Sequence, residues 1–199
     1  KNFEYEASRS AADRFINLHP RHPHAAYAYY IKGLSSFTDD SGLFNRFFVS
    51  DLSKRDMGPA QNSFDDLSEF LSRYPESKYA PHAKQRMIFL RNLLARHEMH
   101  VADFYMKRGA YLAAISRAKY VIEHIPNTPQ TPYALSVLIE AYGILDYPEL
   151  KKSNLEVLRS NFPEFSIQED SATGKRSWVN VISFGMFGDK DIPAPSNTE

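Results

Sequence analysis

The chain has 199 residues, 43% of them hydrophobic and 24% charged, which is an ordinary composition for a globular protein. Its 24 basic and 24 acidic residues cancel, so no net charge favours nucleic acid or an anionic membrane as a partner. The absence of cysteine excludes disulfides, thiolate metal sites and a cysteine nucleophile, and no apolar run reaches the ~18 residues of a membrane span.

The first predicted helix covers residues 5–18 and stops before Pro20, because proline cannot continue a helix. The residues that share one face of this helix, at spacings of three and four, are Ala7, Ala11, Phe15 and Leu18. The following loop, HPRHPH, contains His19, His22 and His24, which could in principle approach one metal ion. Its prolines are expected to hold the backbone extended, which favours solvated loop histidines over a metal site.

The next helical hairpin pairs residues 25–37 with residues 59–74. Gly33 and Ser63 are the small residues at which we expect these two helices to approach closely. An insertion at about residues 38–58 separates the helices, and long loops inside compact arrays are usually functional or disordered. The apolar side chains that argue against simple disorder here are Leu43, Phe44, Phe47 and Phe48. The favoured interpretation is that they cover the hairpin, and the alternative is that they contact a partner.

A single long helix is predicted across residues 79–108, because neither glycine nor proline interrupts the chain between Pro81 and Gly109. The residues that trace its apolar stripe are Ala83, Met87, Leu90, Leu94, Val101 and Tyr105. The helices predicted after it cover residues 110–125, 131–145 and 148–161.

Residues 101–126 have the pattern of a tetratricopeptide repeat, a helix–turn–helix unit of about 34 residues. The two helices are expected to cross at the small residues Ala102 and Ala114, with Tyr105 and Tyr111 beside the crossing. Gly109 occupies the turn, and Pro126 ends the second helix. Similar helical runs end before Pro20, Pro75 and Pro163. The predicted fold is therefore all-α: a tandem tetratricopeptide-repeat superhelix with an inserted loop and a flexible C-terminal tail.

Two regions are predicted along the chain. Residues 1–163 form the array, which consists of half a repeat followed by three repeats, and residues 164–199 form a tail that is partly disordered. The tail contains the apolar stretch SWVNVISFGMFG at 177–188, with Trp178 and Phe184, which either docks on the array or binds a partner. Because the first helix looks like the second member of a pair, we expect the chain to be a fragment of a longer protein.

Motifs that indicate catalysis are weak. His97 and His100 lie one helical turn apart, with Asp103 a turn further on, but the HExxH pattern of zinc enzymes is absent and surface histidines are the favoured interpretation. No glycine-rich phosphate loop and no GxSxG motif is present. The sequence therefore predicts a protein that is not an enzyme and that has no cofactor and no metal.

Three stretches resemble the BamD (ComL) family of repeat lipoproteins of the outer-membrane β-barrel assembly machinery in Gram-negative bacteria. They are DRFINLHPRHPHAAYAYYIKGL (13–34), DDSGLFNRFFVSDLSKRD (39–56) and KQRMIFLRNLLARHEMHVADFYMKRGAYLAAISR (84–117). The resemblance covers about residues 1–163, and the middle stretch is its most specific part because generic repeat proteins lack that insertion. The tail after residue 164 departs from the family pattern.

The resemblance implies a non-catalytic scaffold at the periplasmic face of the outer membrane. Its implied partners are the periplasmic domain of the barrel-forming, BamA-type subunit, accessory Bam lipoproteins and unfolded outer-membrane proteins. Membrane contact would occur only through a lipid anchor that is absent from this chain. Arg117 matches the family's basic residue at the contact with the barrel subunit, and the other candidate partner-binding residues are Phe44, Phe47, Phe48, Trp178 and Phe184. The alternative function is a generic tetratricopeptide adaptor of the cell envelope, unrelated to barrel assembly.

Overall fold

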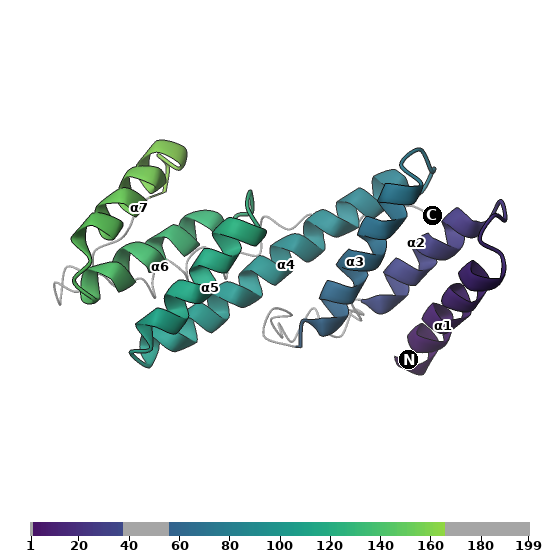
Figure 1. Cartoon of the computed structure of the whole chain (residues 1–199), viewed down its shortest axis with the longest axis horizontal. Helices are drawn as coiled ribbons and strands as arrows, with labels where there is room; N and C mark the ends of the chain where they lie inside the picture. Colours follow the sequence, from purple (N-terminus) through teal and green to yellow (C-terminus); the bar gives the residue numbers. More distant parts are fainter. Residues whose placement is uncertain (1, 38–55, 166–199) are drawn as a thin grey trace, which may run out of the picture. The chain divides into compact units, whose positions relative to one another are not determined.

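The computed structural model describes residues 2–37 and 56–165, and every regular element in those two ranges is an α-helix (Figure 1). The all-α class predicted from the sequence is therefore confirmed. Most of the predicted insertion at 38–58 and nearly all of the predicted tail at 164–199 lie outside the described residues.

The described helices begin and end within a few residues of the predicted bounds. They are α1 (Asn2–Leu18), α2 (Ala25–Ser36), α3 (Gly58–Arg73), α4 (Ala80–Lys107), α5 (Tyr111–His124), α6 (Thr131–Ile144) and α7 (Pro148–Asn161). The long uninterrupted helix is confirmed, because α4 has 28 residues. Packing follows chain order, with α1 on α2, α2 on α3, α5 on α6 and α6 on α7, as in an array of helical hairpins.

Proline sets the C-terminal ends of four described helices. Helices α1, α3, α5 and α7 each end two residues before a proline, and the residue between has left the helical conformation. Its φ is −133° at Tyr74, −127° at Ile125 and −135° at Phe162. The proline ring clashes with the backbone of the preceding residue in the helical region, so each helix stops at a position that the sequence specifies.

Glycine makes the tight turn between α4 and α5. The Ala110 N–H donates to the Tyr105 carbonyl at 2.9 Å, and the Gly109 N–H donates to the Met106 carbonyl at 3.0 Å. This pair of bonds is a Schellman motif, which needs a left-handed residue just beyond the helix, and Gly109 has φ 73°. A side chain would strain that conformation, so glycine is the residue that fits.

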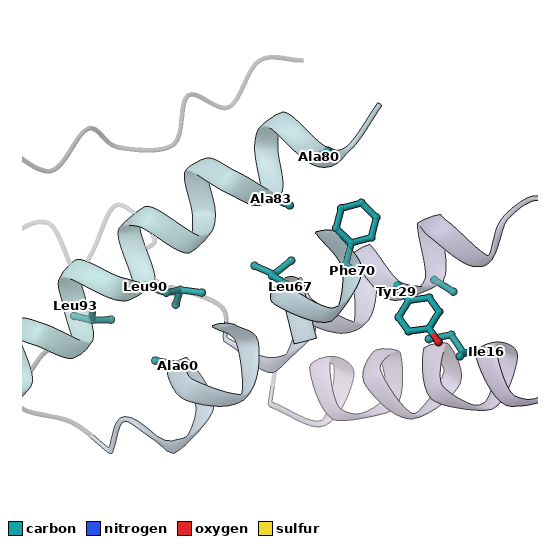
Figure 2. Packing of buried hydrophobic residues seen from close by; sticks show 10 residues of the cluster. Ile16, Tyr29, Ala60, Leu67, Phe70, Ala80, Ala83, Leu90 and Leu93 are labelled. Carbon is teal, nitrogen blue, oxygen red and sulfur yellow. The ribbon is translucent and has the colours of Figure 1, made fainter. Parts of the chain in front are cut away.

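The described residues form two compact units, and the boundary between them falls inside α4, after Leu94. In the first unit the core lies among α1, α2, α3 and the beginning of α4 (Figure 2). Leu67, Phe70 and Leu90 are fully buried there. Burying a side chain of this size contributes about 1.5–3 kcal/mol to folding, so each of these three residues adds substantially to the stability of the unit.

Helices α2 and α3 approach each other closely at two small residues. The Ser63 hydroxyl donates a 2.7 Å hydrogen bond to the Gly33 carbonyl, and both residues are buried. A Cβ atom added at Gly33 would lie 2.6 Å from Leu67 Cδ2 and 3.2 Å from the Leu67 backbone nitrogen. The crossing therefore has room for a hydrogen atom at position 33 and no room for a methyl group.

The predicted packed face of α1 is wrong at three of its four residues, and only Phe15 is half-buried against the core. Leu18 is 61% exposed, and Ala7 and Ala11 are exposed as well. The buried side chains of α1 are instead Ala12 and Ile16. The predicted face and the buried face are neighbouring stripes of residues with the same helical spacing. Both stripes contain alanine, which is tolerated in buried and in exposed positions. The position of α2 decides between them, and residue spacing alone does not specify it.

In the second unit, small residues hold α5 against its neighbours. Ala114, Ala118 and Val121 are all fully buried, as their spacing predicts. Helix α6 is buried along most of its length, and its Leu135 and Ile139 form a cluster with a leucine of α7. A helix that is apolar nearly all round belongs in the interior, so α6 is the central helix of this unit.

One carboxylate links the first three helices. Asp66 of α3, 8% exposed, accepts from Arg9 of α1 at 3.1 Å, from Lys32 of α2 at 3.3 Å and from the Ser36 hydroxyl at 2.8 Å. Lys32 also pairs with Asp13 at 2.9 Å. Burial alone would lower the pKa of Lys32, but the hydrogen bond to Asp13 and the charge of Asp66 outweigh it and raise that pKa. Lys32 therefore stays charged and keeps Asp66 paired.

Replacing Gly33 with alanine should destabilise the first unit. Overpacking costs about 1–3 kcal/mol, and alanine recovers up to about 1 kcal/mol through its higher helix propensity, so we expect a net loss of about 1–2 kcal/mol. Urea unfolding followed by circular dichroism measures it. Gly143→Ala is the matched control, because a Cβ on that exposed glycine of α6 meets nothing closer than the Lys151 side chain at 3.4 Å. Equal effects of the two substitutions would contradict the close crossing.

Replacing Asp66 with alanine should cost about 1.5–3 kcal/mol, because charge-assisted hydrogen bonds on partly buried donors are lost together. Asp66→Asn should recover part of this loss by keeping the shape and one acceptor. The control is Asp65→Ala at the neighbouring exposed carboxylate, which contacts only Gln61 of its own helix and should change the unfolding free energy by less than about 0.5 kcal/mol. If Asp65→Ala is as damaging as Asp66→Ala, the carboxylate does not link the helices.

Candidate protein-interaction surface

Arg117, the basic residue singled out from the sequence, lies on the side of α5 next to its buried stripe. Its Nη1 atom is 3.2 Å from Glu98 Oε2 on α4, and the two side chains are 45% and 15% exposed. A carboxylate from another helix thus contacts the guanidinium of Arg117, although the arginine side chain stays nearly half exposed. The ion pair between Arg117 and Glu98 could not be predicted from the sequence, because the two residues belong to different helices.

The ion pair leaves Arg117 with binding capacity. A guanidinium has five N–H donors in a rigid planar fork, and one donor is directed at Glu98. The remaining N–H groups can donate to a second carboxylate, while Glu98 restricts the rotamers of the long side chain. An arginine oriented in advance loses less entropy when it binds an acidic partner than a freely moving one does.

Beside Arg117, the outer face of α5 carries large apolar side chains. Leu112 is 71% exposed and Tyr120 is 42% exposed, and the Tyr120 ring stacks on His124 at 4.7 Å between centroids. Together with Lys119 they line an open hollow of about 410 Å³, whose described lining residues all belong to α5. We refer to this surface as the α5 hollow. This surface was not predicted from the sequence, although Leu112 and Tyr120 lie two helical turns apart and off the buried stripe.

A second aromatic surface in the first unit was also overlooked. The rings of Tyr30 and Tyr79 stack at 4.8 Å, and Tyr27, 47% exposed, lies 5.3 Å from Tyr79. Tyr30 shares a 2.7 Å hydrogen bond with His82. Burial raises the pKa of Tyr30, and the phenols of Tyr27 and Tyr79 raise it further, so the hydroxyl stays protonated. We call these four residues the tyrosine cluster, and the run YAYY at 27–30 was its signal in the sequence.

The other candidate residues fall into two groups. The aromatic candidates for partner binding lie outside the described residues; they are Phe44, Phe47, Phe48, Trp178 and Phe184. Among the predicted repeat positions, the structure buries four small residues, namely Gly33, Ser63, Ala102 and Ala114. Tyr105 and Tyr111 are half-buried, Gly109 forms the left-handed turn, and Pro126 follows the end of α5.

The histidine loop is folded differently from the prediction. The backbone was expected to be extended, but it turns, with hydrogen bonds from His22 N–H to the His19 carbonyl at 3.1 Å and from Ala25 N–H to the His22 carbonyl at 2.9 Å. The rings of His19 and His22 lie 5.4 and 5.3 Å from the Phe15 ring, which draws the loop back onto α1.

Two kinds of site are absent from the part of the chain that the structure describes. Within residues 2–37 and 56–165, no three His, Cys, Asp or Glu side chains gather so that they could hold a metal ion. In the same ranges, no helix combines the length and the apolarity that crossing a bilayer requires.

Comparison with known proteins adds what geometry alone does not give. The outer membrane protein assembly factor BamD of Neisseria gonorrhoeae is 40% identical over 164 residues, which are 82% of this chain and 61% of that protein. The BamD of Xylella fastidiosa is 37% identical, covering 82% of this chain and 56% of its own length. The BamD of Vibrio cholerae is 32% identical, and the match covers 79% of this chain and 66% of that protein.

This chain thus spans roughly three fifths of the length of the curated relatives that it matches. The family YfiO, described as outer membrane lipoprotein, matches residues 1–158. That match takes in all the described helices except the last residues of α7. By this match and by its relatives, the chain belongs to the YfiO family of outer membrane lipoproteins.

Proposed function

We propose that this chain is part of a non-catalytic scaffold for outer membrane protein assembly, and that α5 is its contact with the barrel-forming subunit. The observation that carries the proposal is the placement of Arg117, half-exposed and oriented by Glu98, beside the exposed apolar side chains of the α5 hollow. The names of the relatives, outer membrane protein assembly factors, support the process. The location is the periplasmic face of the outer membrane, with a lipid anchor holding the full-length protein.

The chemistry of α5 fits a protein partner. Arginine and tyrosine are enriched among the residues that dominate binding energy at protein interfaces, and such residues need apolar neighbours that exclude water. Arg117 can bind a carboxylate of the barrel subunit's periplasmic domain, while Leu112 and Tyr120 supply the apolar surround. Accessory lipoproteins are further partners in this proposal.

The tyrosine cluster favours a second binding function, for unfolded outer-membrane proteins. Segments that become barrel strands alternate apolar and polar residues and carry aromatic girdles. Exposed tyrosine rings offer apolar faces for such side chains and hydroxyl groups for the backbone. Tyr27 is accessible at the edge of the Tyr30–Tyr79 stack, so it can extend the stack to an incoming ring.

A generic repeat adaptor of the cell envelope is the alternative function. The relatives disfavour it, because three species contribute proteins of one name at 32–40% identity. The experiments below separate the two functions, since a generic adaptor would bind neither the barrel subunit nor unfolded barrel proteins.

Reversing the charge of Arg117 should weaken binding of the barrel subunit's periplasmic domain by about tenfold or more, which corresponds to at least ~1.4 kcal/mol. Arg117→Glu alone also places two carboxylates together at Glu98, so it should lower stability as well. The charge swap Arg117→Glu with Glu98→Arg restores the ion pair within the chain. We expect the swap to recover the unfolding midpoint in urea while binding, measured by titration calorimetry, stays weak.

Arg14→Glu on the exposed side of α1 is the charge-matched control and should leave both measurements unchanged. A swap that binds as tightly as the parent chain would remove Arg117 from the interface.

Replacing Tyr27 with alanine should weaken binding of an unfolded barrel-protein segment a few-fold, because aromatic pairs contribute about 0.5–1.5 kcal/mol beyond their buried area. Fluorescence anisotropy with a labelled strand peptide measures the affinity. Tyr147→Ala is the control, since that tyrosine is 52% exposed in the second unit. Equal losses for the two variants would show that general surface hydrophobicity, and not the tyrosine cluster, binds the peptide.

A further inference from the structure

The α5 hollow exposes two large apolar side chains among polar ones, and no described residue outside α5 lines it. Leu112 is the most exposed of the large apolar side chains described, at 71%, and Tyr120 adds a half-exposed ring about two turns further along the helix. Lys119 and Glu123, four residues apart with opposite charges, also line the hollow, so its lining carries no net charge at neutral pH. An uncharged segment with apolar side chains can therefore cover Leu112 and Tyr120 without adding an unmatched charge.

The chain contains one such segment beyond its described residues. Residues 177–188, SWVNVISFGMFG, include no charged side chain, and most of their side chains are apolar. We propose that residues 177–188 bind the α5 hollow of the same chain. This inference goes beyond the scaffold function proposed above and does not depend on it.

The length of the connecting chain permits this binding. The described residues end at Phe165, whose ring contacts Tyr133 of α6 edge-on at 5.0 Å, and α6 packs directly on α5. Residues 166–176 can extend by up to about 3.6 Å each, or roughly 40 Å in total. Helix α5, with 14 residues, is about 21 Å long, so the segment can reach any part of it.

Tethering also favours the chain's own segment over a separate molecule. A short linker holds its end at an effective concentration in the millimolar range, well above that of a free partner or a second copy at ordinary protein concentrations. Even a weak apolar contact is then occupied most of the time. Because Arg117 lies beside the hollow, the bound segment would shield the apolar surround of that arginine from other proteins.

Trp178 provides a direct test, because it is the single tryptophan of the chain. In the full 199-residue chain, without any partner, we expect blue-shifted Trp178 emission and weak quenching by acrylamide. Leu112→Asp should shift the emission to the red and raise the quenching constant several-fold. Leu18→Asp is the matched control, since that leucine is also exposed, on α1, and it should leave Trp178 unchanged.

A covalent test identifies the occupant. The chain has no cysteine, so Ser116→Cys combined with Phe184→Cys introduces the only two thiols. Binding within one chain predicts a disulfide in a product of monomer mass at all protein concentrations. A product of dimer mass that grows with concentration would assign the hollow to a second copy and overturn the proposal.

Solvent-exposed Trp178 emission in the parent chain, or emission that shifts only when the barrel subunit is added, would overturn it as well. If Leu112→Asp lowers the helical circular dichroism, Tyr120→Lys replaces it as the test variant, with the same expected shift of Trp178.

Discussion

The structure depends on how closely neighbouring helices approach one another. A helix of 12 to 16 residues, such as α2 or α3, is marginal in water by itself, so its stability comes from the face that it buries. Between these two helices the approach is limited by a glycine, a serine whose hydroxyl is satisfied by a carbonyl, and a leucine that fills the remaining space. In the second unit, alanine performs the same role on α5. Small side chains therefore determine which surfaces remain outside.

The outward surface of α5 follows from this packing. Once Ala114 and Ala118 face inward, helical geometry turns Leu112 and Tyr120 towards solvent and leaves Arg117 between the two faces. Arg117 can reach back to Glu98 from there, and its position is fixed from within the unit. The backbone packing determines which face of α5 is exposed, and three or four side chains on that face determine what it can bind.

Much of this fold could be predicted from the sequence, because its strongest signals are local. Prolines fix helix ends through a clash with the preceding residue, and Gly109 fixes a turn through its left-handed backbone. What could not be predicted depends on residues far apart in the chain. The face that α1 buries depends on where α2 lies, the partner of Arg117 lies on another helix, and Tyr79, just before α4, stacks on a ring of the YAYY run in α2. Alternation and spacing contain no information about such pairs.

Helix α4 runs without interruption through the boundary between the two compact units. Its central peptide groups are satisfied by carbonyls four residues away, so cutting the chain at Leu94 would expose donors and acceptors on both sides. Neither unit is therefore a separable module, although each has its own core. In a repeat array, order spreads between neighbours through such shared elements, and a defect in one unit frays the helix towards the other. The two compact units are therefore expected to unfold together, because α4 belongs to both of them.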